Sequence, residues 1–117
     1  MKVIIAGSRD ITDMNLLLCA LDIYPIDITE VVSGGANGVD RLGEEWAKEH
    51  NVPLTIFPAE WDKYGKIAGP IRNGNMAFYA DALVAIWDGK SRGTKNMVDQ
   101  MNKLQKPSYI FQKEQLA

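Results

Sequence analysis

The sequence has little of the residues from which disulfides and metal centres are built. One cysteine, Cys19, and one histidine, His50, occur in 117 residues. A single cysteine cannot form a disulfide within the chain, and the two residues together are too few for a Cys- or His-based metal cluster. We therefore expect no metal centre. Nucleophilic catalysis by a Ser–His or Cys–His pair would require His50 as its base.

Long apolar runs are also missing. Crossing a bilayer takes about 20 consecutive apolar residues, and the apolar segment 1–7 is too short for a secretory signal. We expect a cytoplasmic protein with no membrane partner. The 13 basic and 15 acidic residues give a net charge of -2. This balance argues against a protein that holds nucleic acid with its whole surface, although a local basic patch remains compatible with it.

Known phosphate and cofactor fingerprints are absent from the sequence as well. It contains no G-x-x-x-x-G-K-[ST], no G-x-G-x-x-G after the first expected strand and no H-E-x-x-H. The first absence argues against hydrolysis of ATP or GTP on a P-loop, and the second against the usual dinucleotide site. We assign no cofactor to the chain.

What the sequence does have is a regular alternation of short β-branched runs and amphipathic segments. Strict alternation implies right-handed crossovers, and strands that are apolar throughout fit a sheet covered on both faces. We predict a single α/β domain over residues 1–117, with a Rossmann-like, doubly wound, mainly parallel five-stranded sheet and helices on both faces. Strands are expected at 3–6, 29–32, 52–57, 82–87 and 108–111, helices at 13–24, 39–49, 70–79 and 94–104, and an irregular segment at 58–69.

Three of the segments that follow expected strands are rich in glycine and small hydroxyl residues. The carboxyl ends of parallel strands meet at one edge of a sheet, where ligands bind. Glycine permits close approach of the backbone, and the free N–H groups at a helix start favour an anion. A phosphate site is therefore predicted at this edge, although any one loop could be a simple turn. The candidate ligand-binding residues are Gly7, Ser8, Arg9, Ser33, Gly34, Gly35, Ala36, Asn37, Gly38, Asp40, Arg72, Asn73, Asp88, Gly89, Ser91, Arg92, Gly93 and Thr94.

Some of these candidates have a purely structural alternative. Arg72 falls in the first turn of a helix predicted to start at Pro70, where a cation opposes the helix dipole, so it serves a ligand unless it is an ordinary surface residue. Asp40 either braces the glycine-rich loop or touches the ligand. Trp61 and Tyr64, in the irregular segment, could stack on a base or cover the edge of the sheet.

Taken together, these segments resemble a known family. Gly7-Ser8-Arg9, Ser33-Gly34-Gly35-Ala36-Asn37-Gly38-Val39-Asp40, Gly69-Pro70-Ile71-Arg72-Asn73 and Trp87-Asp88-Gly89 through Gly93-Thr94 look like the YspA-like, cytosolic YpsA-related branch of the SLOG superfamily. The resemblance extends over residues 3–111. It implies a Rossmann-like fold, a site for a nucleotide or nucleotide-derived ligand, and an origin in bacteria or their phages.

The wider superfamily includes the LOG enzymes, phosphoribohydrolases that cut the N-glycosidic bond of nucleoside monophosphates. Their motif P-G-G-x-G-T-x-x-E is similar to the segment at Gly93-Thr94, but Met97 stands in the place of the catalytic glutamate. Arg72 resembles the enzymes' active-site arginine and is the candidate catalytic residue. Methionine can neither stabilise an oxocarbenium-like state nor activate water. The aspartates that could substitute for the glutamate are Asp40, Asp81 and Asp88.

The departure at Met97 favours binding of a nucleotide-like small molecule over its hydrolysis. A nucleoside-monophosphate N-glycosidase is the first alternative. A single-stranded nucleic-acid binder is the second, because the superfamily also includes the DNA-processing protein DprA, although the acidic balance counts against it. The sequence leaves the oligomeric state open. Because the related enzymes are commonly dimers, a homodimer or higher homo-oligomer is one possibility, and the candidates for its interface are Trp61, Tyr64, Phe78 and Tyr79.

Overall fold

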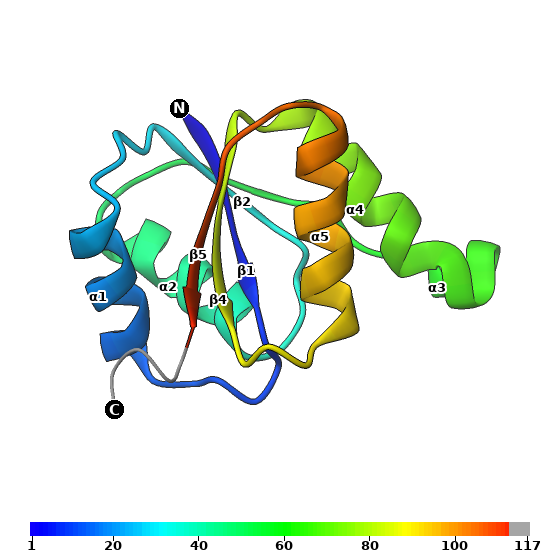
Figure 1. The fold of residues 1–117 in the computed structure, drawn as a ribbon, viewed down its shortest axis with the longest axis horizontal. Coiled ribbons are helices and arrows are strands. Elements are labelled where there is room, and N and C mark those ends of the chain that lie inside the picture. The colour runs from blue at the N-terminus through cyan, green and yellow to red at the C-terminus, as the bar shows by residue number, and fades with distance from the viewer. Residues whose placement is uncertain (113–117) are drawn as a thin grey trace.

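A computed structural model describes residues 1–112, so the last five residues of the expected domain 1–117 lie outside the described residues. Five parallel strands form one sheet in the order β3-β2-β1-β4-β5, which confirms the predicted α/β architecture (Figure 1). The elements are β1 (Lys2–Gly7), α1 (Met14–Ile23), β2 (Glu30–Ser33), α2 (Val39–Glu49), β3 (Leu54–Ile56), α3 (Trp61–Tyr64), the 3₁₀ turn η1 (Gly65–Ile67), α4 (Ala68–Tyr79), β4 (Ala82–Trp87), α5 (Arg92–Lys103) and β5 (Ser108–Gln112).

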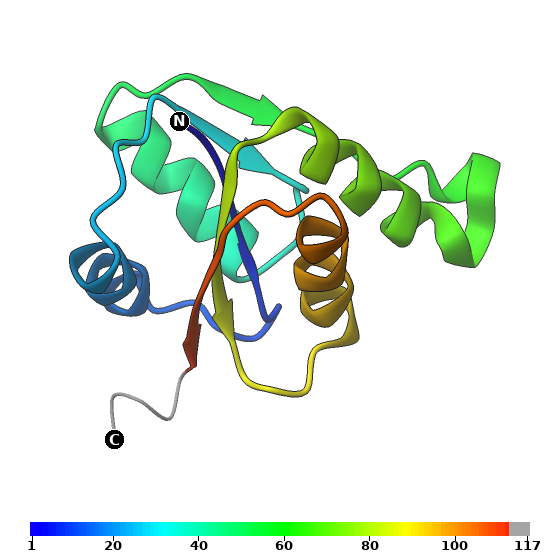
Figure 2. The ribbon, with the colours of Figure 1, turned by 45° about the horizontal axis from the view of Figure 1, so that its top comes forward.

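Helices cover both faces of the sheet, as Figures 1 and 2 show. Val3 and Ile5 of β1 belong to the core under α1 and α2, whereas Ile4 and Ala6 belong to the core under α4 and α5. Because successive residues of a strand point to opposite faces, a strand covered twice must be apolar at every position. Within residues 1–112, no helix combines the length and the apolar character needed to cross a membrane.

The strand order reverses between β1 and β4. These neighbours pair from Val3 with Ala82 to Gly7 with Ile86, but their following helices, α1 and α5, pack on opposite faces of the sheet. A Cβ added at Gly7 would lie 1.9 Å from the carbonyl oxygen of Ile86, so only glycine fits at the end of β1. A crevice at such a reversal is where open α/β sheets bind ligands.

The prediction of an irregular segment at residues 58–69 is wrong, because most of these residues are helical. Residues 58–69 contain α3, η1 and the start of α4, which begins at Ala68 rather than at Pro70. Proline is tolerated throughout a first turn, where backbone N–H groups have no acceptor within the helix, so Pro70 does not mark the first residue. Arg72 is consequently the fifth residue of α4 and lies outside its first turn, which removes the dipole argument for this residue.

Helix α5 also starts earlier than predicted. It begins at Arg92 because Ser91 is its N-cap, with the Ser91 hydroxyl accepting a hydrogen bond of 3.3 Å from the N–H of Thr94. Serine is among the preferred N-cap residues for this reason. Gly93 and Thr94 therefore belong to the first turn of a helix rather than to a loop.

Candidate functional site

A cleft of about 420 Å³ opens at the carboxyl-terminal edge of the sheet. The segments after β1, β2 and β3 contribute to its walls, and α4 closes it from the side. One wall is cationic and glycine-rich and the other is apolar. The lining residues are Arg9, Gly34, Gly35, Ala36, Asn37 and Arg72 on the first wall and Ile56, Pro58, Ala59 and Trp61 on the second.

The loop between β2 and α2 has a conformation that requires glycine. Gly35 and Gly38 have φ of 74° and 77°, in the left-handed region. A Cβ added at Gly38 would also lie 2.4 Å from the carbonyl oxygen of Ser8. Gly38 is the N-cap residue of α2 and places no side-chain cap on the helix. The first turn of α2 thus begins at this edge without a side-chain cap, and the N–H of its first residue, Val39, donates to the carbonyl oxygen of Ser8 over 3.3 Å.

Asp40 braces this loop from within. Its side chain is 5% exposed, and its Oδ2 accepts a hydrogen bond of 3.2 Å from the N–H of Ala36. Burial raises the pKa of Asp40 to about 6, while the Ala36 N–H and the charge of Arg72 act in the opposite direction. Titration of this carboxyl therefore falls close to neutral pH.

Ser33 and Glu44 form a second brace beneath the loop. The Ser33 hydroxyl donates to Glu44 Oε2 over 2.7 Å and accepts from the N–H of Gly35 over 3.1 Å. Ser33 is fully buried. The hydroxyl therefore fixes the turn at Gly35 rather than facing the cleft.

Arg72 reaches from α4 to the glycine-rich loop. Its Nη1 donates to the carbonyl oxygen of Gly34 over 2.6 Å, and its Nε donates to Asn73 Oδ1 over 2.9 Å. Burial lowers the pKa of Arg72, the charge of Asp40 raises it, and the nearby charge of Arg9 lowers it further. Arginine nevertheless keeps its proton in proteins. The positive charges of Arg9 and Arg72 repel one another across the cleft. A bound anion would offset this repulsion.

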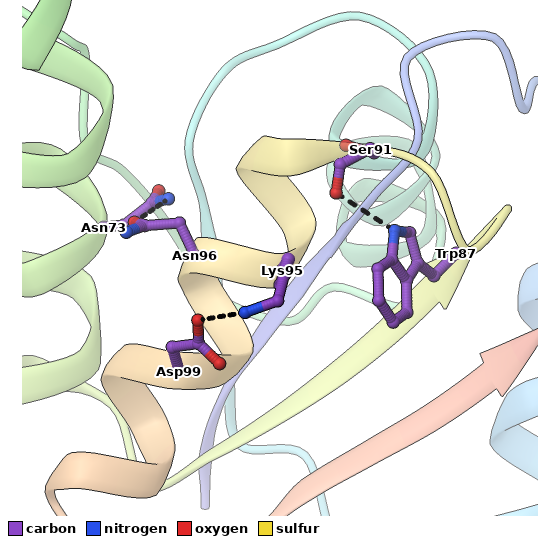
Figure 3. A network of polar contacts seen from close by, with 6 residues as sticks. All are labelled: Asn73, Trp87, Ser91, Lys95, Asn96 and Asp99. Carbon is purple, nitrogen blue, oxygen red and sulfur yellow. Dashed lines mark hydrogen bonds and ion pairs between the residues drawn. The ribbon is translucent and has the colours of Figure 1, made fainter.

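Asn73 connects α4 to the start of α5. Its Nδ2 donates to Asn96 Oδ1 over 3.0 Å and to the carbonyl oxygen of Gly93 over 3.3 Å. Figure 3 shows Asn73 and Asn96 facing each other between the two helices. The adjacent Arg72 is thereby held at a fixed distance from the beginning of α5.

The loop between β4 and α5 is stabilised by its own side chains. Asp88 Oδ1 accepts from the N–H groups of Lys90 and Ser91 over 2.8 and 2.9 Å, which lowers the pKa of Asp88. The indole N–H of Trp87 donates to the carbonyl oxygen of Ser91 over 3.1 Å (Figure 3). The Ser8 hydroxyl accepts from the N–H of Asp88 over 3.0 Å. The backbone donors of Asp88, Lys90 and Ser91 are thus already engaged within the protein.

Comparison with known proteins identifies the family. A family model described as "YspA, cpYpsA-related SLOG family" matches residues 1–64, which is more than half of the chain. The chain belongs to this SLOG family. It is also 33% identical over 120 residues to "Gene 61 protein" of Mycobacterium phage D29, an alignment that covers 94% of this chain and 95% of the phage protein. No solved structure matches the chain.

The SLOG-family match ends within α3, so it contains the first two predicted ligand loops but not Arg72 or the loop after β4. The fold nevertheless brings Arg72 to Gly34. Beside the main cleft lies a smaller cavity of about 60 Å³, where Arg9, Ala36 and Arg72 recur. Its other lining residues are Ala6, Asp40, Asn73, Met76, Gly93, Thr94 and Met97.

The remaining predicted residues stand behind or beside these walls. Gly7, Ser8 and Gly38 shape the backbone at the crevice, and Ser33 braces the glycine-rich loop. The predicted residues after β4 fall into two groups. Gly93 and Thr94 face the small cavity, whereas Asp88 and Ser91 form the turn that precedes α5. Gly89, with a φ of 82°, permits that turn, and Arg92 is the exposed first residue of α5.

Three aspartates were candidates for the position of the missing glutamate, and the fold separates them. Asp81 lies at the opposite edge of the sheet, where its Oδ2 accepts from the N–H of Lys2 over 2.8 Å. Asp88 is occupied by the turn that follows β4. Asp40 lines the small cavity together with Met97. Of the three, Asp40 is the one that shares a cavity with Arg72 in this SLOG-family chain.

The apolar wall of the cleft contains residues that the sequence did not single out. Ile56 is the last residue of β3, and Pro58 and Ala59 follow it. Residues 56–59 contain no glycine and no hydroxyl residue, so they do not predict a phosphate site. The rule that strand ends meet at one edge could have found them, because it applies to every parallel strand. Glu44 was also missed, although it lies one helical turn after Asp40.

Proposed function

We propose that this protein binds a nucleotide or nucleotide-derived ligand and holds its phosphate at the cationic wall of the cleft. The observation that carries the proposal is the convergence of Arg9, Arg72 and the glycine-rich loop at residues 34–37 on one cavity. Guanidinium groups are among the donors that phosphate oxygens accept from most readily. Membership of the SLOG family supports a nucleotide-related ligand.

Arg72 is suited to this role because it is already oriented. Its bonds to Gly34 and Asn73 use two of the five N–H donors of a guanidinium group. The remaining donors are available for a planar, two-point contact with a phosphate. Since the side chain is fixed before the ligand arrives, less conformational entropy is lost on binding.

Calorimetric titration tests the proposal. The folded protein is titrated with nucleoside monophosphates, ADP-ribose derivatives and cyclic nucleotides, and saturable binding to at least one of them is expected. Arg72→Gln should weaken that binding about ten-fold or more, since a charge-assisted hydrogen bond contributes roughly 1.5–3 kcal/mol. Lys103→Gln removes the same charge at the far end of α5 and should leave the affinity unchanged. Absence of binding to every compound would contradict the proposal.

Hydrolysis of a nucleotide N-glycosidic bond is a second candidate, favoured by one observation. Asp40 lines the small cavity with Arg72 and has a pKa of about 6, which suits a general acid or base near neutral pH. In this reaction water adds to the sugar carbon, the bond to the base breaks, and the base leaves with a proton. Asp40 would activate the water.

The hydrolase candidate predicts release of free base from a nucleoside monophosphate, measured by chromatography. Both Arg72→Ala and Asp40→Asn should abolish the release. A protein that binds the nucleotide but releases no base is a binding module, and a release that survives either substitution contradicts the assigned roles.

A further inference from the structure

The second wall of the cleft is apolar and therefore does not serve to bind a phosphate. Ile56, Pro58, Ala59 and Trp61 face the cationic wall across the same cavity. Two of these side chains are large, apolar and exposed: Ile56 at 47% and Trp61 at 52%. Exposed apolar surface rimmed by charged groups is typical of a site that is covered when a ligand binds.

Trp61 is exposed, and the far end of its ring lies beside α4. It is the first residue of α3, and a Cβ added at Gly69 in the first turn of α4 would lie 3.5 Å from Cη2 of the Trp61 ring. The far end of the indole therefore lies within van der Waals reach of the first turn of α4. A half-exposed indole that lines the cleft offers a flat apolar platform. An aromatic platform of this kind binds a nucleobase by stacking, with little preference among bases.

We infer that Trp61 is the base-stacking residue of the cleft, so that the protein selects nucleotides over sugar phosphates that lack a base. This inference rests on the proposed function, because the phosphate at the cationic wall sets the end from which the base extends. The cavity of about 420 Å³ lies within the range of small-ligand sites, which begins near 300 Å³. An anionic group at one wall and a flat apolar group at the other match a nucleoside monophosphate.

Paired titrations separate the base from the phosphate. The wild-type protein, Trp61→Ala and Trp61→Phe are each titrated with AMP and with ribose 5-phosphate. Wild-type protein should bind AMP about ten-fold or more tightly than ribose 5-phosphate. Trp61→Ala should weaken AMP about ten-fold and leave ribose 5-phosphate within two-fold, while Trp61→Phe should retain most of the affinity for AMP, since stacking on an aromatic ring is the interaction removed.

Phe78 provides a matched control. It is an aromatic residue of α4 that is 79% exposed, so Phe78→Ala removes a comparable apolar surface away from the cleft and should leave both affinities unchanged. Thermal melting of each variant establishes that it is folded.

Each outcome has a distinct meaning. Equal affinities of the wild-type protein for AMP and ribose 5-phosphate would overturn the base subsite while the phosphate site stands. Equal losses for both ligands in Trp61→Ala would also overturn it, because Trp61 would then act on the phosphate wall. A Trp61→Ala protein that changes its oligomeric state but not its affinity for AMP would assign the residue to a subunit interface. Failure of both compounds to bind would remove the proposed function itself.

Discussion

Arg72 and Gly34, which are 38 residues apart in the chain, are joined by a hydrogen bond of 2.6 Å from the guanidinium Nη1 to the glycine carbonyl oxygen. A Cβ added at Gly34 would lie 2.6 Å from the same nitrogen. The glycine therefore leaves the space that the guanidinium occupies. This contact connects the loop after β2 to α4 and gives the cleft its cationic wall.

Substitution of Gly34 by alanine should displace Arg72. Because the atom in conflict is the end of a flexible side chain, we expect the fold to persist and the free energy of unfolding to change by less than about 1 kcal/mol. Affinity for a bound nucleotide should fall about ten-fold, as a charged hydrogen bond contributes roughly 1.5–3 kcal/mol. Calorimetry measures the affinity. Gly74→Ala is the control, since its nearest neighbour lies 3.9 Å away; an unchanged affinity in Gly34→Ala would contradict the role of Arg72.

The packing of α2 on β1 gives a prediction about stability. A Cβ added at Gly43 would lie 2.8 Å from the Cβ of Ile5, in the core. Overpacking a core typically costs about 1–3 kcal/mol, so Gly43→Ala should lower the free energy of unfolding by that amount in a denaturant titration. Gly74→Ala should leave it equal or raise it by up to about 1 kcal/mol, because alanine is the better helix former. A Gly43→Ala protein as stable as the wild type would mean that α2 packs differently.

The raised pKa of Asp40 gives a pH dependence. Burial raises this pKa from 3.8 to about 6, so the folded protein binds the proton more tightly than the unfolded chain. The stability of the wild-type protein therefore decreases, relative to Asp40→Asn, as pH rises from about 4 to above 6. One pKa unit corresponds to about 1.4 kcal/mol, which sets the decrease at up to about 3 kcal/mol. Denaturation of both proteins at pH 4, 5, 6 and 7 measures it; parallel curves would show that Asp40 is not perturbed.

Lys106 caps the end of α4. Its Nζ donates to the carbonyl oxygens of Ala77, Phe78 and Ala80 over 2.8, 2.9 and 2.7 Å. Lys106→Met keeps the apolar stem but removes all three bonds, and we expect a loss of about 1–3 kcal/mol in the free energy of unfolding. Lys66→Met, at an exposed position of η1, should change it by less than about 0.5 kcal/mol. Equal stabilities of the two variants would contradict the capping role.

The fold could be predicted from the sequence because its strands have a clear sequence pattern. β1 and β4 are apolar at every buried position and end at Gly7 and Trp87, and this pattern identifies a sheet covered on both faces. The segment 58–69 could not be placed in the same way. It has no clear periodicity, and Pro70 suggested a helix start that lies two residues earlier, at Ala68. Helix boundaries set by tertiary packing are the part that local sequence determines least.

The candidate site was predicted as a set of loops but not as a cavity. The loop at Gly34, which its glycines mark in the sequence, lines the cleft in the structure, and Gly34 leaves room for the close approach of Arg72. The same signal marks the loop at Asp88, where the N–H groups of Lys90 and Ser91 already donate to Asp88 Oδ1. The sequence pattern of glycine and hydroxyl residues does not distinguish these two arrangements. The apolar wall at Trp61 was identified only as one of two alternatives, since exposure of an aromatic side chain depends on the fold around it.

Amide chemical-shift mapping tests the central claim most directly. ¹⁵N-labelled protein is titrated with AMP, and the amide signals are followed residue by residue. Saturable shifts should be concentrated at residues 34–38, at Arg9 and at the side chain of Arg72, and Arg72→Gln should reduce them at equal ligand concentration. Shifts confined to another surface, or none at saturating AMP while the protein remains folded, would contradict a nucleotide site at the carboxyl-terminal edge of the sheet.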